Sequence, residues 1–470
     1  MRTDKFVPDI ATALREAGVS DGMTLSFHHH LRNGDFVVNM VLDALAALGV
    51  KDLRIALSSV FPVHEALVGH IKSGLVRALD TNYVSGPVAK ALSKGVLAQP
   101  VMFRSHGGRA RAIGEGGLKI DIACVAAPCT DNMGNINGSQ GPSACGSLGY
   151  ILPDVEHAAK VIAITDFVSE TPLNSISIPH SRVDYVVKVD SIGNPAGIVS
   201  GSINLTRDPI AHAIARSAQA VIRASGLFRD GFNYQTGAGG ASLAASQYLR
   251  EDMRRMRMRG GFLLGGITKY MVDMLKEGLF DAIFDVQCFD LHSVQSLAEH
   301  ASHYEISADT YANPKQKSCA VDFLDAVLLG ASEVDVNFNV NVHTDSNGIL
   351  IGGSGGHNDA AAGAKITIIV APLVRARLPI VVERCTTITT PGKSVDVLVT
   401  ERGIAVNPGQ AELSARMKEA RLPLYSIEEL RAMALKITGA PQKLALRDTL
   451  VGIVEYRDGS IIDSVYAPQT

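Results

Sequence analysis

The stretch Asn233–Ser242 combines residue types that could stabilise a negative charge. Its sequence, Asn-Tyr-Gln-Thr-Gly-Ala-Gly-Gly-Ala-Ser, predicts a short strand that ends in a glycine-rich turn, followed by a helix over residues 242–257. Such a turn directs backbone N–H groups outward, and a helix N-terminus adds partial positive charge. A plain strand-to-helix turn is the alternative. The candidate donors to an anion or an oxyanion are the N–H groups of Gly237, Ala238, Gly239 and Gly240.

Three consecutive histidines follow the predicted strand 23–27. Neighbours on a strand face opposite ways, which disfavours a zinc site, and a solvent-exposed loop is a second alternative. We favour a loop that contacts an anion, because histidine and arginine side chains donate hydrogen bonds to carboxylates. The candidate side chains are His28, His29, Arg32 and Asn33.

A polar glycine-rich loop in the second half of the chain is the third candidate. It comes after the turn Asp345-Ser346-Asn347-Gly348, much as Gly138–Gly141 comes after Asp131-Asn132-Met133-Gly134. Loops of this kind bind ligands where strands end in α/β proteins. The candidates are Gly353, Ser354, Gly355, Gly356, His357 and Asn358.

Strand-like and helix-like segments alternate along the whole chain, which predicts α/β units with mostly parallel sheets. Residues 72–79 are echoed by residues 276–283, and Asp121 and Asp131 are matched to Asp335 and Asp345 at an offset about ten residues longer. We therefore expect two related domains, 1–205 and 206–470, that face each other across a cleft. The boundary is placed just before Asp208-Pro209, where proline suits the first turn of a helix.

Composition limits the classes of function. The 470 residues are 46% hydrophobic with a net charge of −3, so the chain can bury large cores and no basic surface for nucleic acid is expected. No secretory signal and no apolar run long enough to span a membrane is recognised, which predicts a cytoplasmic protein. The six cysteines lack Cys-x-x-Cys spacing, so we expect buried thiols and no metal site.

Arginines recur through residues 250–259 between methionines at helical spacing. The plain interpretation is a helix with methionines in the core and arginines in solvent. The alternative is a surface that docks an acidic protein or a phosphate-bearing cofactor.

Motifs for nucleotide hydrolysis, serine hydrolysis, zinc proteolysis and hydride transfer are not found in the sequence. The remaining chemistry depends on positioning and on an oxyanion hole rather than on a special side chain. Acyl transfer between carboxylates and thiols fits this description.

Several motifs resemble the CoA-transferase superfamily and, within it, the family of bacterial citrate lyase alpha chains. They are Asp21–Thr24, Phe27–Asp35, Asp131–Ile136, Gln235–Gly240, Thr344–Gly348 and Ile351–Asp359. The resemblance covers nearly the whole chain. It implies an enzyme that exchanges acetate for citrate on an acyl-carrier or CoA thioester, with no permanently bound cofactor. The partners it implies are a citrate lyase beta chain, which cleaves the citryl thioester, and an acyl carrier gamma chain, in a hetero-oligomer.

Many CoA-transferases use a glutamate nucleophile, and the comparable region here, Cys288–Ser293, has no glutamate. The resemblance implies that a citrate carboxylate attacks the thioester directly, with Asp290 as an alternative nucleophile. Two other functions stay open. One is a transferase for citramalate or another carboxylate that forms an acyl-enzyme and shows ping-pong kinetics. The other is a non-catalytic sugar-phosphate sensor, for which no DNA-binding segment is visible.

Overall fold

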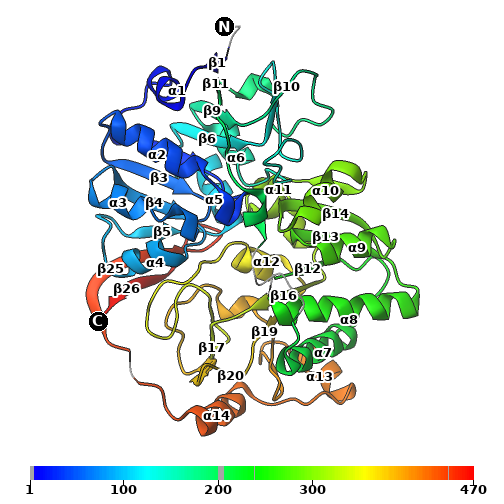
Figure 1. The fold of residues 1–470 in the computed structure, drawn as a ribbon. Coiled ribbons are helices and arrows are strands. Elements are labelled where there is room, and N and C mark those ends of the chain that lie inside the picture. Colours follow the sequence, from blue (N-terminus) through cyan, green and yellow to red (C-terminus); the bar gives the residue numbers. More distant parts are fainter. Residues whose placement is uncertain (1–4, 200–205, 238, 443, 470) are drawn as a thin grey trace.

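The computed structural model describes residues 5–199, 206–237, 239–442 and 444–469. Two large sheets, each covered by helices, form the body of the molecule (Figure 1). One is built mainly from the first 200 residues and the other from residues after 206. The predicted α/β class with two mostly parallel sheets is therefore confirmed.

The first sheet has the strand order β1-β11-β9-β6-β2-β3-β4-β5-β25-β26, and every pair is parallel except β25 with β26. Its strands are β1 (Phe6–Val7), β2 (Thr24–Phe27), β3 (Leu53–Leu57), β4 (Val76–Thr81), β5 (Val101–Phe103), β6 (Ile122–Ala127), β9 (Lys160–Thr165), β11 (Tyr185–Lys188), β25 (Leu446–Glu455) and β26 (Ile461–Pro468). The helices of this part are α1 (Ile10–Glu16), α2 (Val37–Ala47), α3 (Leu67–Lys72), α4 (Gly86–Ser93), α5 (His106–Gly114) and α6 (Leu152–His157).

The second sheet has the order β15-β14-β13-β12-β16-β19-β23-β24, and only β23 with β24 is antiparallel. Its strands are β12 (Tyr234–Thr236), β13 (Gly260–Ile267), β14 (Phe280–Cys288), β15 (His303–Glu305), β16 (Ala326–Gly330), β19 (Ile366–Val370), β23 (Val397–Val399) and β24 (Ile404–Val406). The helices here are α7 (Pro209–Ala224), α8 (Gly240–Met256), α9 (Lys269–Lys276), α10 (Leu291–Glu299), α11 (Ala308–Ala312), α12 (His357–Gly363), α13 (Ala411–Glu419) and α14 (Ile427–Thr438).

Short strands form smaller sheets beside each large one. The orders are β10-β7-β8, β18-β17-β22 and β20-β21. Their strands are β7 (Cys129–Asp131), β8 (Ile136–Asn137), β10 (Val168–Ser169), β17 (Glu333–Asp335), β18 (Val340–Asn341), β20 (Val374–Arg375), β21 (Leu378–Pro379) and β22 (Val381–Val382).

Seven consecutive strands follow the same order in both large sheets, as the predicted duplication requires: β11-β9-β6-β2-β3-β4-β5 in the first and β23-β19-β16-β12-β13-β14-β15 in the second. Both echoed segments, 72–79 and 276–283, form a helix end, a glycine and a strand. Gly74 (φ +81°) and Gly278 (φ +70°) occupy the left-handed region there, as a helix C-terminus favours. In both halves, the strand that follows this glycine pairs in parallel with the strand before it: β4 with β3, and β14 with β13.

The predicted alignment of the aspartates is wrong. Asp121 accepts the amide of Thr24 (2.9 Å) exactly where Asp325 accepts that of Asn233 (2.8 Å). Asp131 accepts the amides of the residues two and four positions later, and Asp335 does the same. Both aspartate pairs, Asp121 with Asp325 and Asp131 with Asp335, are 204 residues apart, as residues 72–79 and 276–283 are, so no insertion between these segments is needed. Asp345 misled the comparison because it makes the same type of local turn with Asn347 and Ile349.

The last hairpin, β25–β26, extends the first sheet through β25 and β5. The ribbon shows this red hairpin beside the blue strands of the first sheet (Figure 1), and its residues also contact the second half, where the amide of Ile388 donates to Asp463 Oδ2 (2.6 Å). The expected second domain, 206–470, is thus not continuous: its final strands belong to the first sheet. The expected boundary at residue 205 lies outside the described residues.

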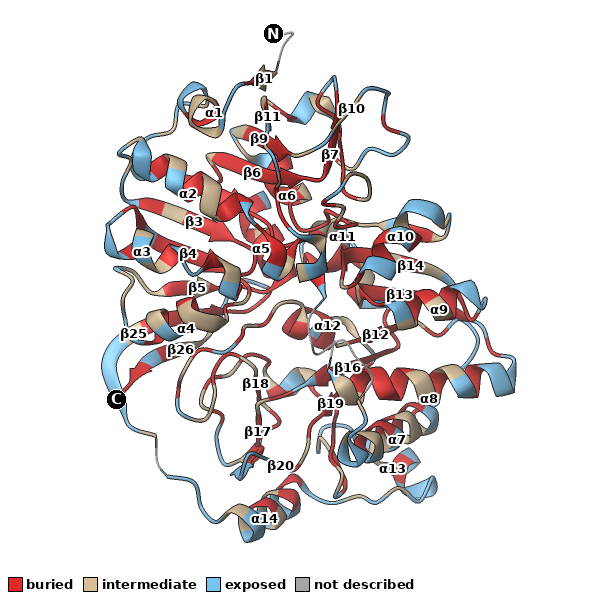
Figure 2. Cartoon of the chain, viewed as in Figure 1, coloured by how far each residue is buried: buried red, intermediate tan, exposed pale blue. Residues whose placement is uncertain are grey.

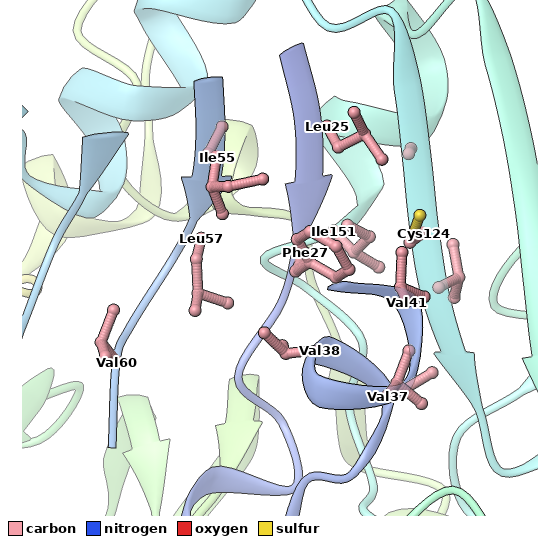
Figure 3. Close-up of a cluster of buried hydrophobic side chains, with 14 of the residues drawn as sticks. Leu25, Phe27, Val37, Val38, Val41, Ile55, Leu57, Val60, Cys124 and Ile151 are labelled. Carbon is pink, nitrogen blue, oxygen red and sulfur yellow. The ribbon is translucent and has the colours of Figure 1, made fainter. Parts of the chain in front are cut away.

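The core consists of the strands and the inner faces of the helices (Figure 2). In the first sheet, Leu25 and Phe27 of β2 pack with Val38 and Val41 of α2 and with Ile55 of β3 (Figure 3). This packing fixes the carboxyl end of β2, from which the histidine run begins. All six cysteines are buried, as expected.

The arginine-rich segment spans the C-terminal half of α8 and the residues directly after it, and four of its five arginines form ion pairs. Arg250 and Arg254 both bind Glu277, Arg255 binds Asp252, and Arg259 binds Asp281. The alternative of a strongly cationic docking face loses its basis, because exposed charges that are already paired attract a partner only weakly. In the described part of the chain, we find no helix with the length and apolar character needed to cross a membrane.

Candidate active site between the two sheets

A cavity of about 350 Å³ lies between the two halves of the molecule, where the carboxyl ends of central strands from both sheets meet. Its walls in the first half are His29, Arg32, Ser59, Phe61, Tyr83, His106 and Tyr150. Its walls in the second half are Gln235, Thr236, Gly237, Gly266, Gln287, Phe289, Tyr311, Leu329, Gly330, Gly353, Ser354, Gly355, Gly356 and His357. A larger hollow, about 560 Å³, lies beside α14 and away from these strand ends, so we place the site in the smaller cavity.

Among the described residues that line this cavity, only Arg32 carries a formal charge. Its guanidinium carbon lies 4.5 Å from the ring centroid of Phe289 and 5.4 Å from that of Phe61. Burial lowers the pKa of Arg32 somewhat, and no described carboxylate forms an ion pair with it. A cation held between aromatic rings without a counter-charge is suited to bind an anionic ligand.

The three histidines are all buried, which contradicts a solvent-exposed loop. Only His29 lines the cavity; its Nδ1 lies 2.6 Å from Ser58 Oγ, and its ring stacks on Tyr150 with centroids 4.8 Å apart. His28 turns inward, where its Nε2 accepts the amide of Ala126 (2.9 Å). Burial lowers the pKa of His28 to about 4 and that of His29 well below its usual value. Both rings are therefore neutral at physiological pH.

Asn33 lies at the surface next to Arg32 and does not line the cavity. Its Oδ1 accepts the amide of Val63 (3.0 Å), so it braces the loop. The turn depends on Arg32 itself, whose φ is +51°. The expected role of Asn33 at the anion is thus replaced by a structural one.

The predicted strand, turn and helix around residues 233–257 are confirmed as β12 and α8. Gly237 lines the cavity, but its amide donates to Leu328 O (2.8 Å) within the sheet and is not free for an oxyanion. Ala238 lies outside the described residues. Gly239 is the N-cap of α8 and Gly240 its first residue; neither lines the cavity, and neither amide has a hydrogen-bond acceptor among the described residues. The backbone N–H groups that remain available to a ligand in this stretch are thus the described ones at the N-terminus of α8.

The loop Gly353–His357 forms one wall of the cavity. A side chain at Gly356 would place Cβ 2.3 Å from the Tyr311 hydroxyl, so only glycine fits. Both nitrogens of His357 are engaged, Nδ1 with Thr390 Oγ1 (2.7 Å) and Nε2 with Gly330 O (2.9 Å), and burial lowers its pKa to about 4. Asn358 points away from the cavity and its Nδ2 donates to Thr389 O (3.3 Å).

Sequence reasoning missed the aromatic and amide walls. Tyr150 lies between His29 and His106, with its ring 4.0 Å from that of His106. Gln235 donates to the Tyr311 hydroxyl (3.0 Å), and Gln287 donates to His29 O (2.9 Å). Burial raises the pKa of Tyr150 well above its usual value and lowers that of His106 to about 3. Gln235 and Gln287 lie near the carboxyl ends of β12 and β14, a position that the predicted strands could have indicated, whereas Tyr150 does not directly follow a strand and Tyr311 lies within α11.

Asp290 does not line the cavity. It is the N-cap of α10, where one carboxylate oxygen accepts the amide of Ser293 (2.9 Å) and the other that of Lys269 (2.6 Å). Such a carboxylate is held by two donors and is poorly placed to act as a nucleophile. None of the described residues that line the cavity is an aspartate or a glutamate.

Comparison with known proteins agrees with this arrangement. The family model described as citrate lyase, alpha subunit (CitF), matches residues 3–467. The citrate lyase alpha chain of Escherichia coli is 48% identical over 99% of this chain and 91% of its own length, and that of Klebsiella pneumoniae is 47% identical over the same shares.

Solved structures extend the comparison. The alpha subunit of citrate lyase from Streptococcus mutans, solved in complex with citrate, superposes with a TM-score of 0.97 at 46% identity and covers 99% of this chain and 92% of its own. A Pseudomonas malonate decarboxylase hetero-tetramer contains a chain with a TM-score of 0.68 at 17% identity, covering 93% and 84%, which shows the fold alone. The chain belongs to the citrate lyase alpha subunit family, whose members are the citrate transferase subunits of citrate lyase.

Proposed function

We propose that the cavity between the sheets holds citrate beside the acyl thioester, with Arg32 bound to a citrate carboxylate. The observation that carries this proposal is the guanidinium group of Arg32, which has no carboxylate partner among the described residues and lies in a cavity that none of their carboxylates lines. A trianion gains most from a cation that is partly withdrawn from water, because the pair is then less screened. The Streptococcus mutans relative, which was solved with citrate, supports the same ligand.

The reaction then needs no enzyme nucleophile. A citrate carboxylate oxygen attacks the acetyl carbonyl carbon of the thioester, and the C–S bond breaks to release the thiolate and a citryl acetyl anhydride. The thiolate next attacks the citryl carbonyl carbon, the bond from that carbon to the bridging oxygen breaks, and acetate leaves. One thioester replaces another, so the step requires neither ATP nor a metal ion, and no permanently bound cofactor is proposed.

Both steps pass through a tetrahedral oxyanion. No described residue accepts the amides of Gly239 and Gly240 at the start of α8, and this end carries the partial positive charge of a 17-residue helix. We assign the oxyanion site to this helix start, which comes shortly after Gly237, a residue of the cavity wall. The neutral imidazole rings of His29 and His106 and the hydroxyl of Tyr150 supply further polar groups on the wall from the first half.

The physiological thioester is proposed to be that of an acyl carrier gamma chain, with acetyl-CoA as a surrogate. A citrate lyase beta chain would receive the citryl carrier and cleave it. The chain is therefore proposed to work in the cytoplasm as part of a hetero-oligomer with these two partners.

Oxygen transfer tests the mechanism directly. In a single turnover with citrate labelled with ¹⁸O in its carboxylates, direct attack places one labelled oxygen in the acetate released. An acyl-enzyme would instead give first-turnover acetate without label, because its oxygen would come from the enzyme. Parallel assays of acetyl-CoA with citrate, citramalate and malonate test the substrate, and a preference for citramalate or malonate would overturn the assignment to citrate.

A further inference from the structure

Asp359 of α12 lies at the junction of the two halves, directly behind the cavity. Its side chain is completely buried and reaches the first turn of α5 in the other half. Ser105 Oγ donates to Asp359 Oδ1 (2.8 Å), and the amide of Gly107 donates to Oδ2 (2.9 Å). A carboxylate from the second half thus caps a helix of the first.

The helix turn that Asp359 holds carries a wall of the cavity. His106 is the first residue of α5, and its amide donates to Gly355 O (2.9 Å) in the loop before α12. Its ring stacks on Tyr150, and both rings line the cavity. The position of this aromatic wall therefore depends on contacts across the junction.

Arg457 provides the counter-charge for Asp359. It lies in the turn between β25 and β26, the hairpin that joins the first sheet from the end of the chain. Its Nε is 3.7 Å from Asp359 Oδ1, and its Nη2 donates to Ala312 O (2.9 Å). At 3.7 Å this is an ion pair without a hydrogen bond, so Asp359 keeps its acceptor capacity for α5.

A buried carboxylate at a similar place in the first half provides a comparison. Asp154 is the third residue of α6, as Asp359 is of α12, and it forms a bidentate ion pair with Arg109 of α5 (2.6 and 2.8 Å). Helix α11, the counterpart of α5, has Tyr311 facing Asp359 instead of an arginine. Asp359 instead contacts the start of α5 in the other half of the molecule, and its charge partner comes from the hairpin β25–β26.

We propose that Asp359 is a positioning residue for citrate transfer: it holds the first turn of α5, and with it His106 and Tyr150, in the geometry that the reaction needs, and Arg457 keeps it ionised. The inference rests on the proposed function of the cavity. It makes the C-terminal hairpin part of the catalytic assembly, although no residue of the hairpin lines the cavity among the described residues.

The surroundings of Asp359 make this role depend on pH. Burial raises the pKa of Asp359 to about 6, while Arg457 and the donors from Ser105, His106 and Gly107 oppose the rise. The titratable groups that face it are Tyr150 from the first half, Tyr311 from α11 and Arg457 from the hairpin. Below pH 6 the protonated acid can no longer accept from both donors, so the cap is lost.

The test compares Asp359→Asn with wild type from pH 5 to 8, using citrate and acetyl-CoA. Asp121→Asn is the matched control, since Asp121 also accepts a backbone amide but lies away from the cavity. We expect kcat of Asp359→Asn at pH 8 to fall on the order of tenfold or more, with both KM values little changed. The ratio of wild-type to variant kcat should approach one as the pH falls below 6. Citrate titrates identically in both enzymes, so the ratio reports Asp359 alone.

Arg457 gives a second test that does not require Asp359→Asn to fold. Arg457→Met should move the acid limb of wild-type kcat toward higher pH, because the loss of a nearby cation raises the pKa of Asp359, and Arg457→Lys should restore it. The proposal would be overturned if the ratio of wild-type kcat to Asp359→Asn kcat did not change with pH. It would also be overturned if the acid limb of the kcat profile lay at the same pH in Arg457→Met as in wild type. These results are distinct from failure of the proposed function, which would appear as wild-type protein that does not use citrate at all.

Discussion

The guanidinium group of Arg32 rests on the ring of Phe289, so a cation from the first half of the chain is held by an aromatic side chain from the second. Phe289 can lie there because residue 266 is glycine: a Cβ at that position would be 2.3 Å from the ring. The contact joins the two halves at the site where we expect citrate to bind.

Arg32→Ala should raise the KM for citrate by about thirtyfold, the effect of removing a charged hydrogen-bond partner worth about 2 kcal/mol. The KM for acetyl-CoA should change little. Phe289→Leu should raise the citrate KM only a few-fold, since a cation–π contact contributes about 1 kcal/mol. Steady-state kinetics with each substrate varied separately gives both constants, and equal effects on the two substrates would remove Arg32 from the citrate site.

Gly239→Val tests the oxyanion site at the start of α8. A Cβ at Gly239 would meet only Ser242 Oγ, at 3.9 Å, so the variant should fold. The added side chain should misplace amides that act mainly in the transition state, and losing one such donor costs about 3 kcal/mol, or roughly a hundredfold in kcat.

Gly69→Val is a control for Gly239→Val, because Gly69 also has open space around it but lies in α3, away from the cavity. Citrate binding measured by calorimetry should remain in both variants. If folded Gly239→Val keeps full kcat, the glycine-rich stretch serves only as a turn.

Asp290→Ala separates a helix cap from a nucleophile. Because Asp290 caps α10, its removal should lower the free energy of unfolding by about 1 kcal/mol while kcat stays within about twofold. Urea denaturation and steady-state assays measure the two effects. Mass spectrometry of wild-type enzyme quenched with acetyl-CoA should find no CoA or acetyl adduct on any carboxylate; an adduct on Asp290 would establish an acyl-enzyme instead.

Acid should destabilise the fold through its buried histidines. Burial lowers the pKa of His343 to about 3, so between pH 6.5 and 3 the unfolded chain binds a proton that the folded chain does not. The effect of His343 on the free energy of unfolding is therefore absent above pH 6.5, and it lowers that free energy progressively as the pH falls from 6.5 toward 3. His343→Gln, away from the cavity, should weaken the decline in Tm between pH 7 and 5, and His292→Gln, at an exposed position, should not. Equal pH dependence of Tm in wild type and His343→Gln would contradict this account.

The sequence alone determined the α/β class, the duplication and the family, because alternating apolar periods and short motifs are local properties of the chain. It also located the loops that follow strands, and Arg32, His29 and Gly353–His357 do line one cavity. It could not say which histidine of three neighbours faces that cavity. His28 turns to the backbone of Ala126, almost a hundred residues later, and only the packed sheet sets that direction.

Tertiary structure also decided the roles that depend on distant partners. Asp345 and Asp335 make similar local turns, and only the sheet shows that Asp335 is the counterpart of Asp131. Likewise nothing in the local sequence of Arg457 relates it to Asp359. A buried charge is stabilised by whatever group the fold brings within a few ångströms, and that proximity is set by the pairing of β25 with β5 rather than by spacing along the chain.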